Sequence, residues 1–161
     1  MEPTQKSDLV EIIKAWFGYD PINGMLYRRQ KTRSDAHDWI SCDRISLQFQ
    51  GKWYSYAVLC WVIYYGRFPN GWVDHKDRIK SHNWIANLRE ATPTQNQQNK
   101  AGSGQYAKGV TWRDRKVKPW QAKIRVNGDR LHLGSFATEE EAAEAYRQAA
   151  LKYHGEFACL K

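Results

Sequence analysis

Cysteine is scarce in this sequence, and no two cysteines lie close together. The three residues Cys42, Cys60 and Cys159 are odd in number, and no Cys-x-x-Cys pair occurs. This spacing argues against a cysteine-based zinc site, so no structural zinc is expected. We expect three reduced, partly buried thiols, as in an intracellular protein.

Long apolar runs are also missing. The longest, residues 56–65, is far too short to span a bilayer, and residues 1–8 are polar, unlike a signal peptide. The sequence therefore predicts a cytoplasmic protein that makes no contact with a membrane.

The composition is that of a folded, basic protein. Of its 161 residues 42% are hydrophobic and 14% aromatic, which indicates one ordinary domain or two to three small modules. The eight tryptophans could pack in a core or stack on bases. The formal charge of +8 suggests a polyanionic partner, although many basic proteins bind nothing acidic. Basic density is highest in residues 105–135, with eight Lys or Arg against two Asp or Glu.

Residues 1–70 carry the pattern of a scaffold. Ser7 is a candidate N-cap for a helix over 8–17, whose predicted apolar face holds Leu9, Ile12, Ile13, Trp16 and Phe17. Asn23-Gly24 predicts a turn into a strand over 25–29, and the polar residues 30–43 predict a loop. Alternation at Ile45, Leu47 and Phe49 predicts a strand that pairs with 53–56, before a buried helix that ends at Gly66.

Residues 73–99 concentrate the polar chemistry of the chain. The pattern predicts a strand over 72–75, a polar loop over 77–83, a short strand or turn at 87–89 and a helix over 93–100. Thr92-Pro93-Thr94-Gln95 is a strong helix start, with Pro at the first helical position. The hairpin then carries Asp74 and His75, and the helix carries Asn96.

These residue types suit phosphodiester hydrolysis. An aspartate carboxylate and an asparagine amide oxygen are hard ligands that fit magnesium or manganese. A neutral histidine beside them can take a proton from the attacking water. A cation there would neutralise charge on the phosphate and the leaving 3′ oxygen. The stretch therefore predicts a metal-dependent site that cuts DNA.

The motif D-H-(11 residues)-N-L-R-x-A-T-x-x-Q-N-x-x-N resembles the HNH endonucleases of phages and mobile introns, with their β-β-α metal fold. The resemblance implies that His75 is the general base and that Asp74 and Asn96 are metal ligands. It implies that Asn87 braces the hairpin and orients His75 through backbone hydrogen bonds.

Four other positions near this motif carry weaker signals. Asn83 matches an Asn that often precedes an Arg in such enzymes, but Trp84 stands in the place of that Arg. Asn99 is expected to be a solvated helix residue or a phosphate contact, and His82 a polar loop residue without a role. Tyr56-Ala57-Val58 replaces a common Ala-His-Arg, so any DNA contact by that His or Arg is absent or relocated.

The C-terminal part predicts a separate module behind a small, polar linker. Strands are expected over 109–113, 120–126 and 130–136, with Asn127-Gly128 as a hairpin turn. Thr138 and Glu141 form a capping box, and an alanine-rich stripe follows in the helix: Ala142, Ala145, Tyr146, Ala149, Ala150 and Tyr153.

Strand parity sorts this sheet into two faces. The predicted apolar face holds Val110, Trp112, Trp120, Ala122, Ile124, Val126, Leu131 and Leu133. The opposite face holds Thr111, Arg113, Arg115, Gln121, Lys123, Arg125, Arg130 and His132. A sheet that is apolar on one side and basic on the other can lie in the DNA major groove, although ordinary solvation of the basic face is the alternative.

Residues 105–160 resemble the plant ethylene-response-factor DNA-binding domain of the APETALA family, through the pattern GV…W…AKIR…RLHLGSFATEEEAAEAYRQAALKYHGEFA. The resemblance implies DNA contacts by Arg113, Lys123, Arg125, Arg130 and His132. The chain departs from the family at Thr111, Lys123 and His132, so the plant sequence preference is not expected to carry over.

The sequence as a whole predicts an α+β protein. We expect an HNH nuclease domain over 1–100 with its core motif at 72–100, a linker over 101–105 and an APETALA-like DNA-binding domain over 106–161. The expected activity is metal-dependent nicking or cleavage of double-stranded DNA by a monomer, with Mg²⁺ as the expected ion and Mn²⁺ as an alternative. If a phage encodes the chain, the host cytoplasm is its expected location.

Two other functions stay open at this point. One is a catalytically inactive DNA-binding or regulatory protein on a nuclease-like fold. The other is a structural or interaction protein, for example in phage packaging, whose basic face meets an acidic protein.

Overall fold

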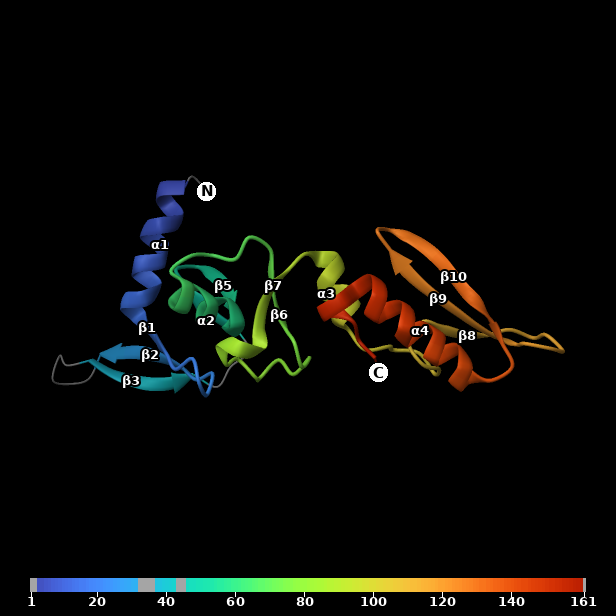
Figure 1. Cartoon of the computed structure of the whole chain (residues 1–161). Coiled ribbons are helices and arrows are strands. Elements are labelled where there is room, and N and C mark those ends of the chain that lie inside the picture. Colours follow the sequence, from blue (N-terminus) through green and yellow to red (C-terminus); the bar gives the residue numbers. More distant parts are fainter. Residues whose placement is uncertain (1–2, 32–36, 43–45, 161) are drawn as a thin grey trace. The chain divides into compact units, whose positions relative to one another are not determined.

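A computed structural model describes residues 3–31, 37–42 and 46–160. The chain forms two compact units, Met1–Pro93 and Thr94–Lys161, and combines small antiparallel sheets with α-helices (Figure 1). The α+β class is therefore confirmed. None of the helices in these described ranges combines the length and apolar character needed to cross a bilayer. All three cysteines are free thiols, with Cys60 and Cys159 buried.

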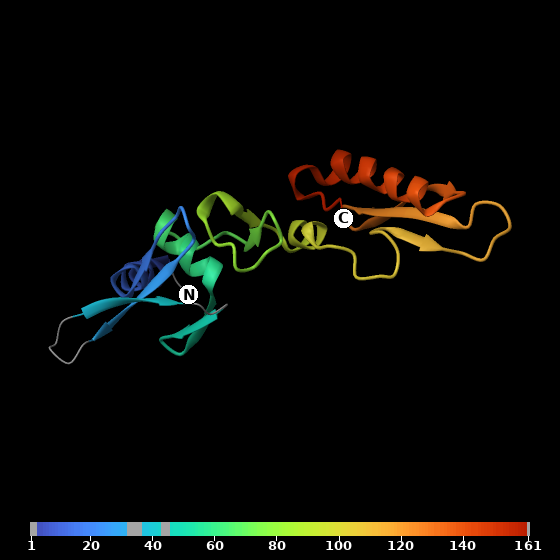
Figure 2. The same ribbon diagram turned by 90° about the horizontal axis from the view of Figure 1, so that it is seen from below.

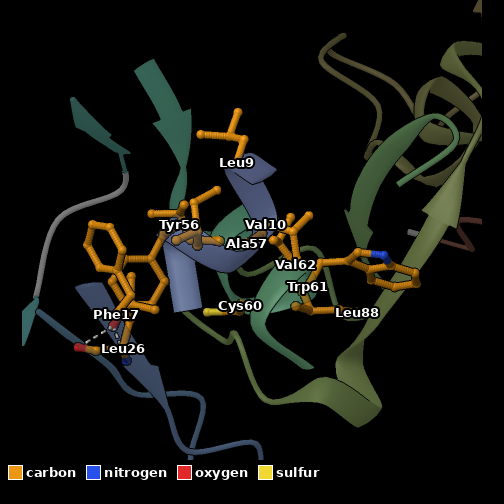
Figure 3. Close-up of a cluster of buried hydrophobic side chains, with 12 residues drawn as sticks. Leu9, Val10, Phe17, Leu26, Tyr56, Ala57, Cys60, Trp61, Val62 and Leu88 are labelled. Atoms are coloured by element: carbon orange, nitrogen blue, oxygen red, sulfur yellow. Dashed lines mark hydrogen bonds between the residues drawn. The ribbon is translucent and has the colours of Figure 1, made fainter. Parts of the chain in front are cut away.

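The core of the first unit is built around helix α2 (Tyr56–Tyr65), as expected from its apolar sequence (Figure 3). Ser55 caps its start, where the Oγ atom accepts a hydrogen bond from the Val58 N–H. Gly66 ends it with φ of 67°, a left-handed conformation that glycine adopts without strain. The Tyr56 hydroxyl lies in this core, 2.6 Å from the Leu26 backbone nitrogen.

Helix α1 (Pro3–Trp16) precedes a sheet with the strand order β1-β2-β3, formed by β1 (Phe17–Tyr19), β2 (Leu26–Lys31) and β3 (His37–Cys42). The helix begins earlier than expected, with Pro3 in its first turn, where the missing N–H costs nothing. Its buried face holds Leu9, Val10 and Ile13, whereas Trp16 is exposed.

The prediction of a loop over 30–43 is wrong for residues 30–31, which end β2, and for residues 37–42, which form β3. This strand pairs antiparallel with β2, from Leu26 opposite Cys42 to Lys31 opposite His37. Its order comes from that pairing, because its own residues lack the apolar alternation of a strand. Strands β4 (Ser46–Phe49) and β5 (Lys52–Ser55) form the expected hairpin, while Ile45 lies outside the described residues.

The segment with the nuclease-like motif forms another hairpin in the same unit. Strand β6 (Trp72–His75) has the predicted bounds and pairs with β7 (Leu88–Ala91), which follows the short 3-10 helix η1 (Ile85–Asn87). Helix α3 (Pro93–Asn99) follows along the chain, and all but its first residue belong to the second unit.

The second unit contains a sheet of the order β10-β9-β8, formed by β8 (Val110–Trp112), β9 (Trp120–Val126) and β10 (Asp129–Phe136). Figure 2 shows helix α4 (Glu139–His154) lying along one face of this sheet. Asn127 and Gly128 both have positive φ, as the predicted two-residue turn requires. Thr138 caps α4 through its Oγ1 atom, which accepts from the Glu141 N–H.

Several residues of this unit differ from the predicted faces. Tyr153 is exposed, and the neighbouring His154 is buried instead, with Nε2 2.9 Å from the Arg125 carbonyl oxygen. Gln121 is buried on the side expected to be solvated, whereas Trp112 and Leu131 are exposed, Leu131 close to the turn of the β9–β10 hairpin. Alternation along a strand predicts which sheet face a residue lies on. How much of that face is buried depends on how far helix α4 extends over it.

Candidate functional site

The hairpin of β6 and β7 places an aspartate opposite an arginine. Asp74 lies directly across from Arg89 in the strand register, and both side chains are buried, with 6% and 9% exposed. The Arg89 Nε and Nη2 atoms each lie 2.9 Å from the Asp74 Oδ2 atom. A buried carboxylate needs such a partner, because burial of an uncompensated charge is costly. Arg89 is a site residue that the motif alone did not single out.

His75, the next residue on β6, is half-buried and is held by an amide. Its Nε2 atom lies 3.0 Å from the Oδ1 atom of Asn83, a residue with only 5% of its surface exposed. The Asn83 Nδ2 atom donates to the carbonyl oxygens of Ser81, at 3.2 Å, and Lys80, at 3.4 Å. The loop between the two strands therefore turns back and places a buried side chain against the imidazole.

Asn87, at the end of η1, ties the same loop to the hairpin. Its Nδ2 atom donates to the His82 carbonyl at 2.7 Å and to Asp77 Oδ1 at 2.9 Å, while its Oδ1 atom accepts from the Asp77 N–H. Its carbonyl accepts from the N–H of Lys76, the residue after His75. These bonds hold the backbone that follows His75 and tie it to the end of η1.

Asp77 is the anchor of the loop. Partial burial raises the pKa of its carboxyl, but hydrogen bonds from the Ile79 N–H, His82 and Asn87 outweigh burial and leave the pKa below its ordinary value. The His82 Nδ1 atom lies 2.6 Å from Asp77 Oδ2, and the His82 ring packs on Trp84 with centroids 4.4 Å apart. His82 therefore makes structural contacts with Asp77 and Trp84 that its sequence context did not predict.

The N-terminal scaffold reaches this loop at three points. The Tyr19 hydroxyl donates to the Asn83 carbonyl at 2.7 Å, and the Ile85 N–H donates to the Pro21 carbonyl at 3.0 Å. Gly24 has φ of 75°, and a Cβ atom there would lie 2.6 Å from the Asn83 carbonyl carbon and would overlap with the Trp84 nitrogen. Residues 19–24 thus fix the backbone on which Asn83 stands.

The two predicted metal ligands fall in different units, Asp74 in the first and Asn96 in the second. Asn96 is half-buried on α3, whereas Asn99 is only 3% exposed, so the prediction of a solvated Asn99 is wrong. In the ranges that the structure describes, no three His, Cys, Asp or Glu side chains gather as a metal-binding group. A carboxylate and an amide oxygen fit a hard cation such as Mg²⁺, which takes few protein ligands and keeps several waters.

The basic residues of the C-terminal sheet lie on one face. Arg125 lies directly opposite Arg130, and Lys123 directly opposite His132, so that each pair shares a face by register. Lys123 is half-buried and the other three are exposed. Arg113 is exposed just beyond β8, where its N–H donates to the Pro119 carbonyl. The structure thus brings together four of the five predicted DNA contacts by strand pairing.

Comparison with known proteins matches the two parts of the chain to different families. Residues 57–98 match the family described as HNH endonuclease. An uncharacterized HNH endonuclease, L560, of Acanthamoeba polyphaga mimivirus is 37% identical over 111 residues. This match covers 67% of the present chain and 57% of the mimivirus protein.

The C-terminal region is similar to plant proteins. The AP2-like ethylene-responsive transcription factor AIL6 of Arabidopsis thaliana is 42% identical over 85 residues, or 52% of this chain and 14% of that protein. The AP2-like factor CRL5 of Oryza sativa subsp. japonica is 52% identical over 56 residues, or 34% of this chain and 8% of that protein. No solved structure matches the chain.

Proposed function

We propose that the protein is an endonuclease that hydrolyses DNA phosphodiester bonds with the help of a divalent metal, because residues 57–98 match the HNH endonuclease family. The observation that carries the proposal is the β6–β7 hairpin, in which a buried aspartate and a braced histidine are adjacent. The proposal takes double-stranded DNA as substrate, a single chain as the acting form and the cytoplasm as its location. A phage or mobile-element origin belongs to the same proposal.

His75 is the proposed general base. Neutral imidazole accepts a proton from water, and its ring is held by Asn83 while the chain on either side is fixed by strand pairing and by Asn87. A base held this way loses little entropy when it meets the attacking water. Asn87 acts indirectly in this proposal, since its bonds go to the loop around His75.

Asp74 and Asn96 are the proposed metal ligands. Both supply hard oxygen donors, and Mg²⁺ is the proposed ion, with Mn²⁺ as the alternative. When bound, such a cation stabilises negative charge on the phosphate and the leaving 3′ oxygen. Arg89 pairs with the charge of Asp74 and also helps to fix its direction, because the Nε–H donates to Oδ2 at 2.9 Å.

The C-terminal sheet is the proposed DNA reader. Like charges directly opposite each other in a sheet are destabilising, yet Arg125 faces Arg130. A phosphate backbone laid on this face relieves that repulsion, so the face suits a polyanion better than bare solvent. A DNA-binding module on the same chain as the nuclease domain raises the effective concentration of the nuclease domain at the site to which the module binds.

A second candidate is a DNA-binding or regulatory protein with a nuclease fold that does not cut. The Asp74–Arg89 ion pair favours this candidate, because a carboxylate held by a guanidinium offers less charge to a cation. If the protein binds DNA but does not cleave it with Mg²⁺ or with Mn²⁺, it is a DNA-binding protein of this second kind.

Digestion of supercoiled plasmid with Mg²⁺, with Mn²⁺ and with EDTA tests the proposal, followed by mapping of the cut ends. We expect cleavage with metal, none with EDTA and none with the His75→Ala variant, which should bind DNA as the wild type does. His82→Ala is the matched control, since it removes an imidazole from the same loop that has no proposed chemical role. Cutting by His75→Ala at the wild-type rate would refute the assignment of the base.

A further inference from the structure

We propose that Asn83 is the positioning residue of the active-site histidine, and that it holds the imidazole with its hydrogen on Nε2 and its basic nitrogen at Nδ1. The inference deepens the proposed nuclease function and rests on it. In this inference the Asn83 side chain orients His75, whereas the motif resemblance assigned that role to backbone hydrogen bonds around Asn87.

The orientation of the Asn83 amide follows from its surroundings. One end of the amide lies within 3.4 Å of the carbonyl oxygens of Lys80 and Ser81, which only accept hydrogen bonds. That end must therefore be the NH₂ group, and the other end, which faces His75, must be the oxygen. A flipped amide would place an oxygen against two carbonyl oxygens and an NH₂ group against the imidazole.

An amide oxygen accepts and never donates, so the nitrogen of His75 that it contacts must carry a hydrogen. In the neutral ring one nitrogen carries the hydrogen and the other carries a lone pair. With the hydrogen on Nε2, Nδ1 holds the lone pair and is the atom that can take a proton from water. The contact also fixes the ring plane, because rotation about the Cβ–Cγ bond would break the 3.0 Å bond.

Asn83 is itself held firmly enough to position another group. Only 5% of its surface is exposed, its N–H donates to the Ser81 carbonyl, and its own carbonyl accepts from the Tyr19 hydroxyl. Tyr19 comes from strand β1, 64 residues away in sequence. Both the backbone and the side chain of Asn83 are therefore fixed independently of His75.

Three variants separate positioning from general support of the loop. Asn83→Ala removes the acceptor, and Asn83→Asp keeps an acceptor toward His75 but loses the donors to Lys80 and Ser81. Tyr19→Phe is the matched control, because it removes a hydrogen bond to the same residue without touching the contact with the imidazole. The readouts are kcat and KM for plasmid cleavage, the melting temperature, and the NMR signal of the His75 Nε2 proton at alkaline pH.

We expect Asn83→Ala to lower kcat by about 10- to 100-fold with KM unchanged, as for a misplaced catalytic group. Its Nε2 proton signal should vanish through exchange with water. Asn83→Asp should recover part of the lost kcat and keep the signal. Tyr19→Phe should lower the melting temperature yet keep the signal and a kcat within about twofold of wild type, because the contact of Asn83 with His75 survives.

Two outcomes overturn the inference in different ways. In the first, His75→Ala is inactive but Asn83→Ala cuts at the wild-type rate, or Asn83→Ala and Asn83→Asp both lose kcat only in proportion to their loss of melting temperature. Asn83 then has no positioning role, and the nuclease function stands. If the wild type does not cut DNA with any metal, the proposed function fails and the role of Asn83 in catalysis fails with it.

Discussion

Arg89 and Asp74 face each other across the hairpin strands and form a buried ion pair, with Nε 2.9 Å from Oδ2. A buried pair of this kind contributes less than its Coulomb attraction suggests, because both groups gave up water to form it. Its loss is costly all the same, since one partner is then left as a buried charge without compensation. The pair therefore links the fold of the hairpin to the residue proposed to hold the metal.

Replacement of Arg89 by Ala should destabilise the first unit strongly. The expected loss in the free energy of unfolding is about 3–5 kcal/mol, the range for a buried ion pair with one partner removed. Urea unfolding followed by tryptophan fluorescence measures it. The double variant Asp74→Asn/Arg89→Met should recover much of the loss, because it leaves no buried charge.

Arg67→Ala is the control for that experiment. Arg67 pairs with Glu90 on the same strand β7, with Nη1 2.6 Å from Oε1, but at the surface. Little change in stability is expected there, because water screens exposed pairs. Equal losses in Arg67→Ala and Arg89→Ala would contradict the distinction between a buried and an exposed pair.

Asp77 predicts a dependence of stability on pH. Its pKa is lowered in the folded state, so ionised Asp77 stabilises the loop above the pKa of the unfolded chain. That contribution is lost as the pH falls below about 4 and through the lowered pKa. Asp77→Asn should therefore melt at a lower temperature than the wild type at neutral pH.

The difference between these two proteins should shrink as the pH is lowered, because protonated Asp77 resembles asparagine. Thermal unfolding from neutral pH to about pH 2 measures it. A difference that stays constant over this range would show that the charge of Asp77 does not support the loop.

Gly24 should not tolerate a side chain. Gly24→Ala adds a methyl group that overlaps with the backbone of Asn83 and Trp84, and it also strains a residue with φ of 75°. Gly51→Ala is a close control, since Gly51 has φ of 74° but nothing within 4 Å of the added Cβ. Both variants should lose about 1–2 kcal/mol from backbone strain.

Only Gly24→Ala should lose more free energy of unfolding than backbone strain accounts for. It should also lose cleavage activity, because it displaces the loop that holds His75. Chemical unfolding and plasmid cleavage on the two variants check this. Equal stability and equal activity would mean that the 19–24 turn does not brace the loop.

Arg130→Gln should weaken DNA binding while it leaves the fold intact or slightly more stable. The substitution removes the repulsion from Arg125, a change of up to about 1 kcal/mol in the stabilising direction. It also removes one phosphate contact, so the slope of log K against log salt should become shallower by about 1. Gel shifts at graded salt and a melting curve test both parts. A lower melting temperature with unchanged binding would contradict the proposed reader face.

Elements with a local cause were predictable from the sequence. Strand β6 and the Asn127-Gly128 turn depend on neighbouring residues, and both lie where expected. Strand β3 was missed because its order comes from pairing with β2 rather than from its own sequence.

The contacts around His75 lay beyond the sequence for a similar reason. The histidine and Asp74 could be proposed from their types and spacing. The acceptor for the imidazole could not, because Asn83 faces it only after the loop has turned back on itself. Tyr19 is still less accessible to pattern reading, since no periodicity links it to a residue 64 positions away.

The contacts made by Tyr19 and Pro21 bear on how the proposed nuclease part could be excised or grafted. The family match begins at residue 57, but two of the hydrogen bonds that shape the loop come from residues 19 and 21. A fragment trimmed to residues 57–98 would keep Asp74, His75, Asn87 and Asn96 but would lose the two hydrogen bonds from residues 19 and 21 that hold the loop. A fragment meant to carry the proposed nuclease activity must therefore start upstream of strand β1.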